Sequence, residues 1–452
     1  MPAATSYDPN SRTIRDAVEA EMRHRRAEIG ANREYYNGIQ AKPLLDDRDN
    51  VVINLCRQVV DETISFLVAG MPKFDLDAAL AQKSDLETWL DECWERSGGA
   101  ALITDMAQNG ALTGQIYVRV APMADGYAQI VNLDPANICT VWSAEDYREI
   151  LWHELHWSTT NPQGVKDNFR LDIVNRETSW SIIPYKQVGG TWEINGDSAE
   201  WFAPIPPVIT WQHLPSANLF YGHHELPHRR LNDSINKVAS DIQSILRYHA
   251  FPTTVGTGFT AGDVEKTSID GFLTVPATDA KIYNVEMQSD LSASLNTLER
   301  LREQFFAQAR VVIMRGDPDA FRGITNLGIR TAFMPMIAKT RTLRLQYSKG
   351  LAKVSQLCLL LAGKPFLDEP KVRWEDSLPV DMVEQMAVLQ QQMAAGLLSK
   401  QTASERLGLN YEVEQKQITT ETIASGVLME GQPVGVSDNS QPTRTQNEKQ
   451  PQ

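Results

Sequence analysis

The stretch LNDSINKVASDIQSI, residues 231–245, decides how the centre of this chain is built. Its apolar residues are spaced four, three, four and three positions apart, and they are Leu231, Ile235, Val238, Ile242 and Ile245. This spacing predicts a helix with one apolar face that packs against another helix. The helical pattern begins at Glu225 and stops at Phe251-Pro252.

A second helix with the same kind of apolar face is predicted after Ser289, which can cap its N-terminus. Its apolar residues are Leu291, Leu295, Leu298, Leu301 and Phe305. The residues between the two helices are rich in Gly and Thr and include FLTVP at 272–276, a composition that favours short strands. We therefore expect a central unit of two helices joined by a small β insertion.

The residues N-terminal to this unit show first helical and then strand periodicity. Four helices are predicted, over 14–28, 54–70, 84–96 and 100–111, and the first is expected to be a surface arm. The second has Asn54 as its N-cap and Gly70 as its C-cap. In the third, Ser84 and Glu87 match the pattern of a capping box. Period-two alternation then predicts an antiparallel meander of five strands, over 115–120, 128–133, 150–157, 170–174 and 180–183. A proline-rich passage at 204–207 closes this region, and the fold class is α+β.

The residues C-terminal to the central unit are expected to be mainly helical. A glycine-bounded loop at 315–323 precedes a long helix that runs to about residue 362 and should kink at Pro335. A short strand at 371–374 and helices over 381–395 and 400–407, the latter capped by Ser399, complete the folded part. The stretch from Gly431 onward has no apolar period and is predicted to be disordered.

Composition and motifs exclude several classes of protein. The 43 basic against 57 acidic residues give a net charge of −14, which is opposite to the basic surface of a sequence-reading DNA-binding protein. The four cysteines form no CxxC pair, and we expect neither a zinc ribbon nor a disulfide framework. The only Gly-Lys pair is followed by Pro365, so a phosphate-binding loop is absent, and no Gly-x-Ser-x-Gly elbow occurs. We expect no secretion signal, membrane span or cofactor.

One cluster of histidines has residue types that could bind a metal ion. His223, His224 and His228 lie near Glu225, and His224 and His228 would be one helical turn apart. Their order does not match a known zinc motif and Pro227 interrupts it, which indicates the start of a helix instead. A metal-dependent hydrolase that uses these histidines remains the enzyme alternative.

The charges between Ile324 and Gly363 are all basic. No Asp or Glu occurs in this stretch, and its cations are Arg330, Lys339, Arg341, Arg344, Lys349 and Lys353. Such a segregated helix could contact nucleic-acid phosphate, pair with acidic faces of neighbouring subunits or simply be solvated. The residues alone leave these three interpretations open.

Several segments, taken in their order along the chain, are similar to one known family. They are YYNGIQ at 35–40, the helix at 54–72 that ends in AGMP, YGHHEL at 221–226 with the helix that follows it, WEDSLP at 374–379 and GLLSKQT at 396–402. Between about residues 34 and 430 the chain resembles the portal proteins of tailed bacteriophages, in the SPP1-like family. It departs from the family where many members read Ser-Gly-x-Ala-Leu, because residues 325–329 are TNLGI here.

The resemblance implies a portal-like fold, mainly helical, with regions arranged around a central DNA channel. On this chain they would be an N-terminal arm (1–30), an antiparallel β wing with helices (31–222), a first stem helix (223–249), a small β clip (250–290), a second stem helix (291–313), a tunnel loop (314–323), a kinked basic helix (324–365), a helical crown (366–430) and a disordered tail (431–452). The tunnel loop would face DNA, with Arg315, Asp317, Asp319, Phe321 and Arg322 as candidate residues. The basic helix would contact DNA or neighbouring subunits through Arg330, Lys339, Arg341 and Arg344.

The resemblance also implies a function and a set of partners. About twelve copies would form a ring at one capsid vertex, a conduit for double-stranded DNA during packaging and ejection, without enzymatic activity or cofactors. The ring would be a docking platform for the terminase large subunit and a head-tail adaptor, and it would also contact major capsid and scaffolding proteins. The protein would be located in the virion, and in the bacterial cytoplasm during assembly. Another ring-forming virion connector is the second alternative.

Overall fold

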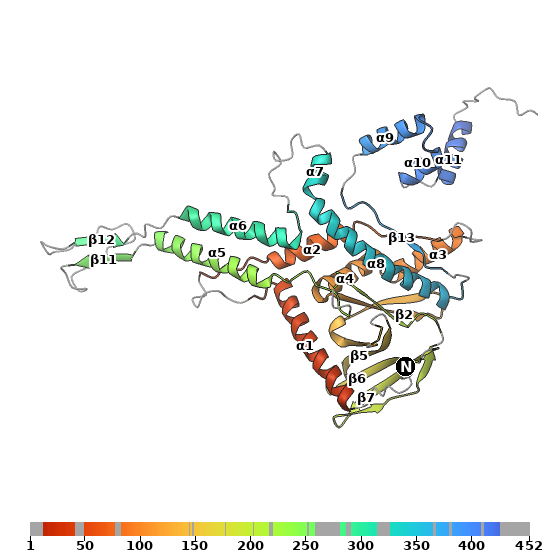
Figure 1. The fold of residues 1–452 in the computed structure, drawn as a ribbon, viewed down its shortest axis with the longest axis horizontal. Coiled ribbons are helices and arrows are strands. Elements are labelled where there is room, and N and C mark those ends of the chain that lie inside the picture. The colour runs from red at the N-terminus through yellow and green to blue at the C-terminus, as the bar shows by residue number, and fades with distance from the viewer. Residues whose placement is uncertain are drawn as a thin grey trace, which may run out of the picture. The chain divides into compact units, whose positions relative to one another are not determined.

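The structure, a computed structural model, describes most of the chain. The described residues are 12–40, 49–76, 83–143, 145–146, 149–176, 178–201, 203–216, 220–250, 253–257, 281–285, 291–313, 326–364, 368–378, 382–407 and 411–424. They fall into two compact units, Met1–Pro379 and Val380–Gln452 (Figure 1). The loop expected at 315–323 and the tail expected from 431 lie outside the described residues. Within the described ranges, every helix is too short or too polar to cross a lipid bilayer.

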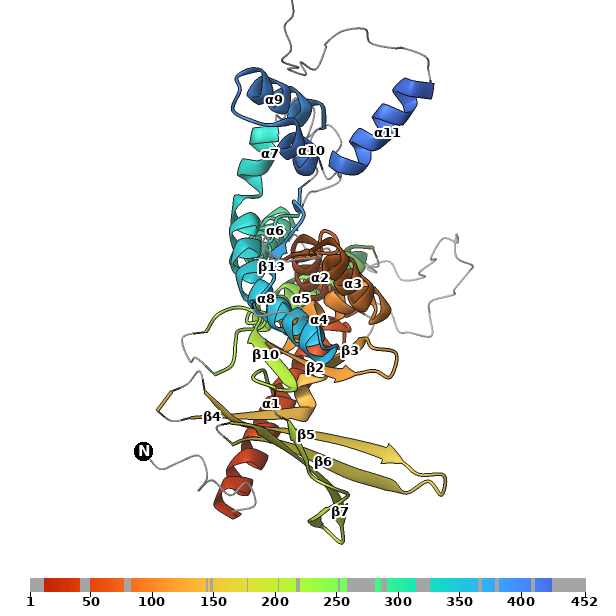
Figure 2. The ribbon, with the colours of Figure 1, turned by 90° about the vertical axis from the view of Figure 1, so that its right-hand side faces the viewer.

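The first helix, α1 (Arg12–Tyr36), is longer than predicted and is not a surface arm. Its side chains Val18 and Met22 are buried against Cys139 and Trp152 of a sheet. Figure 2 shows α1 beside the strands β4 and β5. The expected arm is thus corrected from Arg12 onward, because apolar residues four positions apart give this charged helix one buried face.

Three further helices form the N-terminal part of the core. They are α2 (Leu55–Leu67), α3 (Lys83–Arg96) and α4 (Gly99–Thr113). The predicted N-cap of α2 is confirmed, since Asn54 Oδ1 accepts a hydrogen bond from the Arg57 amide at 3.0 Å. Its predicted C-terminus is wrong, because Val68 caps the helix two residues before Gly70.

The capping box predicted for α3 does not form. The helix begins at Lys83, so Ser84 lies inside the first turn instead of preceding it. The Glu87 carboxylate accepts a hydrogen bond from the Leu76 amide at 2.8 Å, which joins α3 to the preceding segment. A partner outside the helix has therefore replaced the local capping contact.

The predicted strands are present, but they belong to two antiparallel sheets instead of one meander. A three-stranded sheet has the order β10 (Val208–Gln212), β2 (Gln115–Pro122), β3 (Ala128–Leu133). A six-stranded sheet has the order β4 (Ile138–Trp142), β5 (Ile150–Thr160), β6 (Lys166–Asn175), β7 (Trp180–Val188), β8 (Thr191–Ile194), and β9 (Ala199–Trp201) also pairs with β7. The two sheets separate at a single 3-10 turn, Pro135–Asn137, which Asp134 caps through the Ala136 amide.

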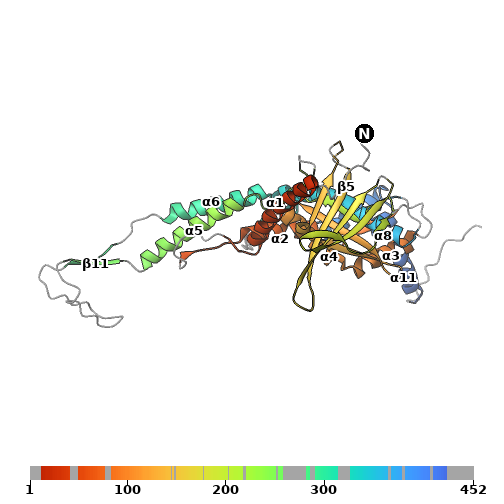
Figure 3. The same cartoon turned by 90° about the horizontal axis from the view of Figure 1, so that it is seen from below.

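The two apolar-faced helices are confirmed as α5 (Arg229–Ala250) and α6 (Leu291–Ala309), which lie side by side (Figures 1 and 3). Between them, β11 (Thr253–Thr257) pairs antiparallel with β12 (Lys281–Val285), in agreement with a β insertion. The rest of the segment between β11 and β12 lies outside the described residues. Leu246 and Leu295 remain 46% and 49% exposed, so one copy of the chain leaves part of this apolar surface open.

An extended segment, residues 49–55, runs along the polar face of α5, which the sequence did not reveal. Four residues of α5 spaced one turn apart bind it, and they are Asn232, Asn236, Ser240 and Ser244. The side chains of the first three accept hydrogen bonds from the amides of Leu55, Ile53 and Val51, in that order. The Ser244 hydroxyl donates a hydrogen bond to Asp49 Oδ2 at 2.9 Å. Since the segment leads directly into α2, these bonds fix α5 to the body of the protein.

The long helix predicted to kink is two helices, α7 (Asn326–Ala332) and α8 (Met334–Leu361). The interruption is at Phe333, and Pro335 lies in the first turn of α8, where its missing N–H costs no hydrogen bond. Gly350 lets α8 lie directly on β10, because a Cβ there would be 2.2 Å from the Trp211 ring. After α8, β13 (Lys371–Arg373) pairs with β1 (Lys73–Asp75).

The second unit contains α9 (Met382–Ala394), α10 (Lys400–Arg406) and α11 (Tyr411–Ala424). The predicted cap of α10 is confirmed, since Ser399 Oγ accepts a hydrogen bond from the Thr402 amide at 3.1 Å. The helix α11 was not predicted. Its polar composition gives it almost no apolar periodicity from which a helix could be recognised.

Candidate functional site

The basic helix predicted from the sequence is α8 together with α7, and the structure divides its cations into three groups. Arg330 lies at the surface and forms an ion pair with Asp376 at 2.8 Å. The Arg344 guanidinium donates hydrogen bonds to the carbonyls of Phe66 and Leu67, the last residues of α2. These arginines thus join α7 and α8 to other parts of the same subunit.

Lys339 is buried and its charge is used inside the subunit. Its ammonium forms an ion pair with Glu225 at 2.5 Å and donates hydrogen bonds to Thr63 Oγ1 and to the Ala309 carbonyl, at 3.0 and 2.9 Å. One side chain therefore connects the residues before α5, the end of α6, α2 and α8. The expectation of a contact with DNA or a neighbouring subunit does not extend to Lys339.

The carboxylate that pairs with Lys339 belongs to a larger buried network. Glu225 also lies 3.2 Å from His213 Nε2, and His213 Nδ1 lies 2.8 Å from the Tyr347 hydroxyl. Burial favours the protonated form of Glu225, but the Lys339 ammonium and His213 outweigh it and lower its pKa below the ordinary value. The sequence contains a sign that Lys339 is buried. It lies three residues after Met336 and four before Leu343, and this spacing places it on the buried face of the helix.

The remaining cations form a surface that we call the basic stripe. It consists of Arg341, Lys349 and Lys353, spaced eight and four residues apart on the exposed side of α8, together with Leu345, which is 61% exposed. No hydrogen bond or ion pair joins the three cations to any residue that the structure describes. The stripe borders a cavity of about 390 Å³, whose lining includes Arg330, Arg341, Arg344, Trp374 and Asp376. Three of the four predicted residues thus come together here.

A second charged surface, which we call the acidic face, lies on α3. It consists of the exposed carboxylates Asp85, Asp91, Glu92 and Glu95, opposite the side of α3 that is buried. Partial burial and the neighbouring carboxylate of Glu87 raise the pKa of Asp91, as expected where like charges crowd together. The buried sides of α3 and α8 meet where Trp94 Nε1 donates a hydrogen bond to Ser355 Oγ at 3.0 Å. The acidic face and the basic stripe therefore lie on the outer sides of two helices that pack together.

The histidines of the metal alternative do not converge. His223 is exposed, His224 lies 3.2 Å from Glu28 through Nε2, and the His228 carbonyl accepts hydrogen bonds at the start of α5. Among the described residues, no three His, Cys, Asp or Glu side chains are grouped in a way that could hold a metal ion.

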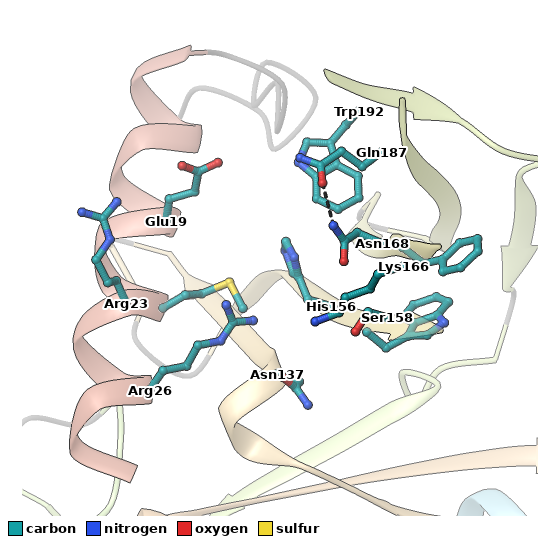
Figure 4. Close-up of a pocket in the computed structure, with 13 residues that line it drawn as sticks. Glu19, Arg23, Arg26, Asn137, His156, Ser158, Lys166, Asn168, Gln187 and Trp192 are labelled. Atoms are coloured by element: carbon teal, nitrogen blue, oxygen red, sulfur yellow. Dashed lines mark hydrogen bonds between the residues drawn. The ribbon is translucent and has the colours of Figure 1, made fainter. Parts of the chain in front are cut away.

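A larger cavity, which we call the sheet pocket, lies between α1 and the six-stranded sheet (Figure 4). Its volume is about 720 Å³. The α1 side is formed by Glu19, Met22, Arg23 and Arg26, and the sheet side includes His156, Ser158, Lys166, Asn168, Gln187 and Trp192. The sequence did not predict this pocket, because its walls come from one helix and four strands.

A buried group of charges supports the floor of the sheet pocket. Glu154 accepts two hydrogen bonds from Arg15 of α1, and it also lies 2.5 Å from His156 Nε2. Although Glu154 is buried, His156 and Arg15 lower its pKa to about 2. Asp172, paired with Arg170 at 2.9 Å, differs, because burial and the nearby Glu154 outweigh Arg170 and raise its pKa to about 7.

We expect Asp172→Asn to change the pH dependence of stability. Between the ordinary pKa of 3.8 and the folded value of about 7, the folded protein keeps a proton that the unfolded chain has lost. The stabilising contribution of Asp172 to the free energy of unfolding is therefore fully present below pH 3.8 and is lost as the pH rises through 7. We compare the midpoints of thermal unfolding of the two proteins. The midpoint of the variant minus that of the unsubstituted protein should increase as the pH rises from about 4 to about 8. Parallel curves for the variant and the unsubstituted protein would contradict the assignment.

One family model matches part of the second half of the chain. Residues 227–425 match the family model described as "Phage portal protein, SPP1 Gp6-like". This region runs from just before α5 to the end of α11 and includes both apolar-faced helices and the basic stripe. The match confirms the resemblance to the SPP1-like phage portal family.

Solved structures are also similar to this chain. One is titled "Neck of empty GTA particle computed with C6 symmetry", at 15% identity and a TM-score of 0.47, covering 79% of this chain and 90% of that chain. Another is titled "Virion of native gene transfer agent (GTA) particle", at 14% identity and a TM-score of 0.46, covering 84% of this chain and 93% of that chain. No curated protein matches.

Proposed function

We propose that this protein is the portal of a phage-like particle, a ring at one capsid vertex through which double-stranded DNA enters and leaves. The observation that carries the proposal is the portal-family match over residues 227–425. The exposed Leu246 and Leu295 on the α5 and α6 pair agree with it, because neighbouring copies would cover this apolar surface. The protein acts as a conduit and has no catalytic role.

The regions of the fold take the following roles in this proposal. The helices α1 to α4 and the two sheets form the wing, α5 and α6 the stem, and β11 with β12 the base of the clip. The loop at 314–323, which lies between α6 and α7 in the sequence, faces the DNA, and residues 366–430 are the crown. The clip and the outer wing contact the terminase, the head-tail adaptor and the capsid and scaffolding proteins.

The contact between subunits follows from the segregated charges. A ring with one kind of contact requires each subunit to present two different surfaces, one to each neighbour. The basic stripe and the acidic face are two such surfaces, opposite in charge and carried on the outer sides of α8 and α3. In the proposed ring, the basic stripe of one subunit pairs with the acidic face of the next.

The net charge of −14 suits a channel through which DNA must slide. A protein that neutralises many phosphates binds DNA tightly, because each contact releases counterions. Three of the basic residues predicted to contact DNA or a neighbouring subunit, Arg330, Lys339 and Arg344, are bound within the subunit. This leaves the α8 region with few cations that could hold DNA in place.

The mass of the purified protein tests the proposal. Twelve copies of the 50.6-kDa chain would weigh about 607 kDa, and negative-stain images should show rings with a central opening. Light scattering that gives only monomer or dimer at every concentration and salt would contradict the portal function. A mass of several hundred kilodaltons without an open centre would contradict the conduit.

A further inference from the structure

The sheet pocket carries an excess of positive charge. Arg23 and Arg26 of α1 and Lys166 of β6 line it, and among the described residues of its lining Glu19 is the single carboxylate. The Arg26 Nε group donates a hydrogen bond to the Ala136 carbonyl at 2.8 Å, which holds its guanidinium at the wall. No ion pair joins Arg23 or Lys166 to a residue within the described ranges. The pocket therefore favours a negatively charged ligand.

The floor of the pocket offers hydrogen bonds at regular spacing. Asn168 Nδ2 donates to Gln187 Oε1 at 2.9 Å, which leaves the Asn168 oxygen and the Gln187 amide nitrogen able to bond a ligand. Ser158 stands beside Asn168 on the neighbouring strand, and Trp192 stands beside Gln187. Adjacent strands are about 4.8 Å apart, so these groups form a row of donors and acceptors ending at an aromatic ring.

The groups of the floor are held in place before any ligand binds. The rings of His156 and Trp192 are nearly perpendicular at 5.4 Å between centroids, and His156 also lies 2.5 Å from Glu154, which is bound by Arg15. The Arg170 guanidinium lies 5.4 Å from the centre of the same Trp192 ring. Fixed side chains lose little conformational entropy when a ligand binds, which is a property of binding sites.

We propose that the sheet pocket binds an acidic, extended segment of another protein. Carboxylates of the segment would pair with Arg23, Arg26 and Lys166. Its main-chain amides would bond the polar row of the floor, and an apolar side chain would contact Trp192. The pocket volume of about 720 Å³ is within the usual range for ligand sites, and it would enclose a few residues of such a segment. The inference goes beyond the proposed function and does not depend on ring formation.

Nucleic acid fits the same pocket less well. Single strands bind by stacking bases on exposed ring faces, and the rings of Trp157 and Phe169 each have one face covered by the other, at 5.6 Å between centroids. The charged lining groups are side chains in the middle of α1 and at the start of β6, without the helix N-terminus that commonly binds phosphate. A duplex is too wide to enter a cavity of this size.

Binding of a model peptide tests the proposal. The probe is a fluorescein-labelled octapeptide of alternating Glu and Val, with the Gln-Val octapeptide and an eight-nucleotide oligo-dT as comparisons. We expect the Glu-Val peptide to bind with a Kd on the order of 10 to 100 μM, measured by fluorescence anisotropy. The double variant Arg23→Ala/Arg26→Ala should weaken binding at least tenfold, because two of the three cations are lost.

The matched control removes the same charge elsewhere. The double variant Lys237→Ala/Lys371→Ala, at exposed lysines of α5 and β13, should bind the Glu-Val peptide as tightly as the unsubstituted protein. A second variant, Trp192→Phe, tests the aromatic ring of the floor. It should weaken peptide binding by a smaller factor than Arg23→Ala/Arg26→Ala does, because both arginines are still present. Equal binding of the Gln-Val peptide, preference for oligo-dT, absence of peptide binding, or equal losses in the two double variants would each overturn the proposal.

Discussion

Replacing Lys349 and Lys353 by glutamate should prevent ring assembly. The substitutions turn the basic stripe negative where it would face the acidic face of the next subunit, and like charges across an interface cost several kcal/mol. Each subunit of a closed ring makes this contact, so the penalty applies around the whole circle. Light scattering at low salt should show the mass falling from that of the ring to that of small oligomers.

A second reversal in the same chain should restore the ring. Adding Asp91→Lys and Glu95→Lys makes the acidic face positive, so the two surfaces again have opposite charges. Reversing two other exposed lysines, Lys237 and Lys371, is the matched control and should leave the ring intact. If both the unsubstituted protein and the variant with Lys349 and Lys353 replaced by glutamate form rings, the proposed contact between the basic stripe and the acidic face is wrong, although the portal function stands. If no version forms rings, the proposed function itself is wrong.

Much of the fold could be predicted because it rests on periodic apolar residues. The pairing of α5 with α6 follows from the spacing that buries Ile235 and Ile242 on one helix and Phe305 on the other. Alternation likewise identified the strands β2, β3, β5, β6 and β7. It could not say which strands pair, and the meander was therefore wrong about the break at the turn Pro135–Asn137.

The features missed are those made by polar side chains with distant partners. Asn232 and Asn236 look like solvent-facing residues in the sequence, but they bind the segment at 49–55. Lys339 looked like one member of a basic set, although its position between Met336 and Leu343 was that of a buried residue. The sheet pocket joins residues that are far apart in the sequence, such as Arg23 and Trp192. Such sites depend on the folded structure, and of these features only the burial of Lys339 had a sign in the local pattern.

Replacing Lys339 by alanine should give the largest loss of stability among the lysines of α8. Removing one partner of a buried ion pair leaves an uncompensated charge, here Glu225, and typically costs about 3–5 kcal/mol. The hydrogen bonds to Thr63 and to the Ala309 carbonyl are lost as well. Thermal unfolding of the unit Met1–Pro379 within the full chain should show a clearly lower midpoint than that of the unsubstituted protein.

The nature of the loss can be tested with two further variants. Lys349→Ala removes an exposed lysine from the same helix and should change stability by no more than about 0.5 kcal/mol. Combining Lys339→Met with Glu225→Gln removes both charges, so no unpaired ion remains and part of the loss should be recovered. If Lys339→Ala were as mild as Lys349→Ala, the ammonium would not be the group that joins α2, α6 and α8. Because Ala309 ends the helix that leads to the loop at 314–323, the same variant should also increase amide hydrogen exchange at the end of α6.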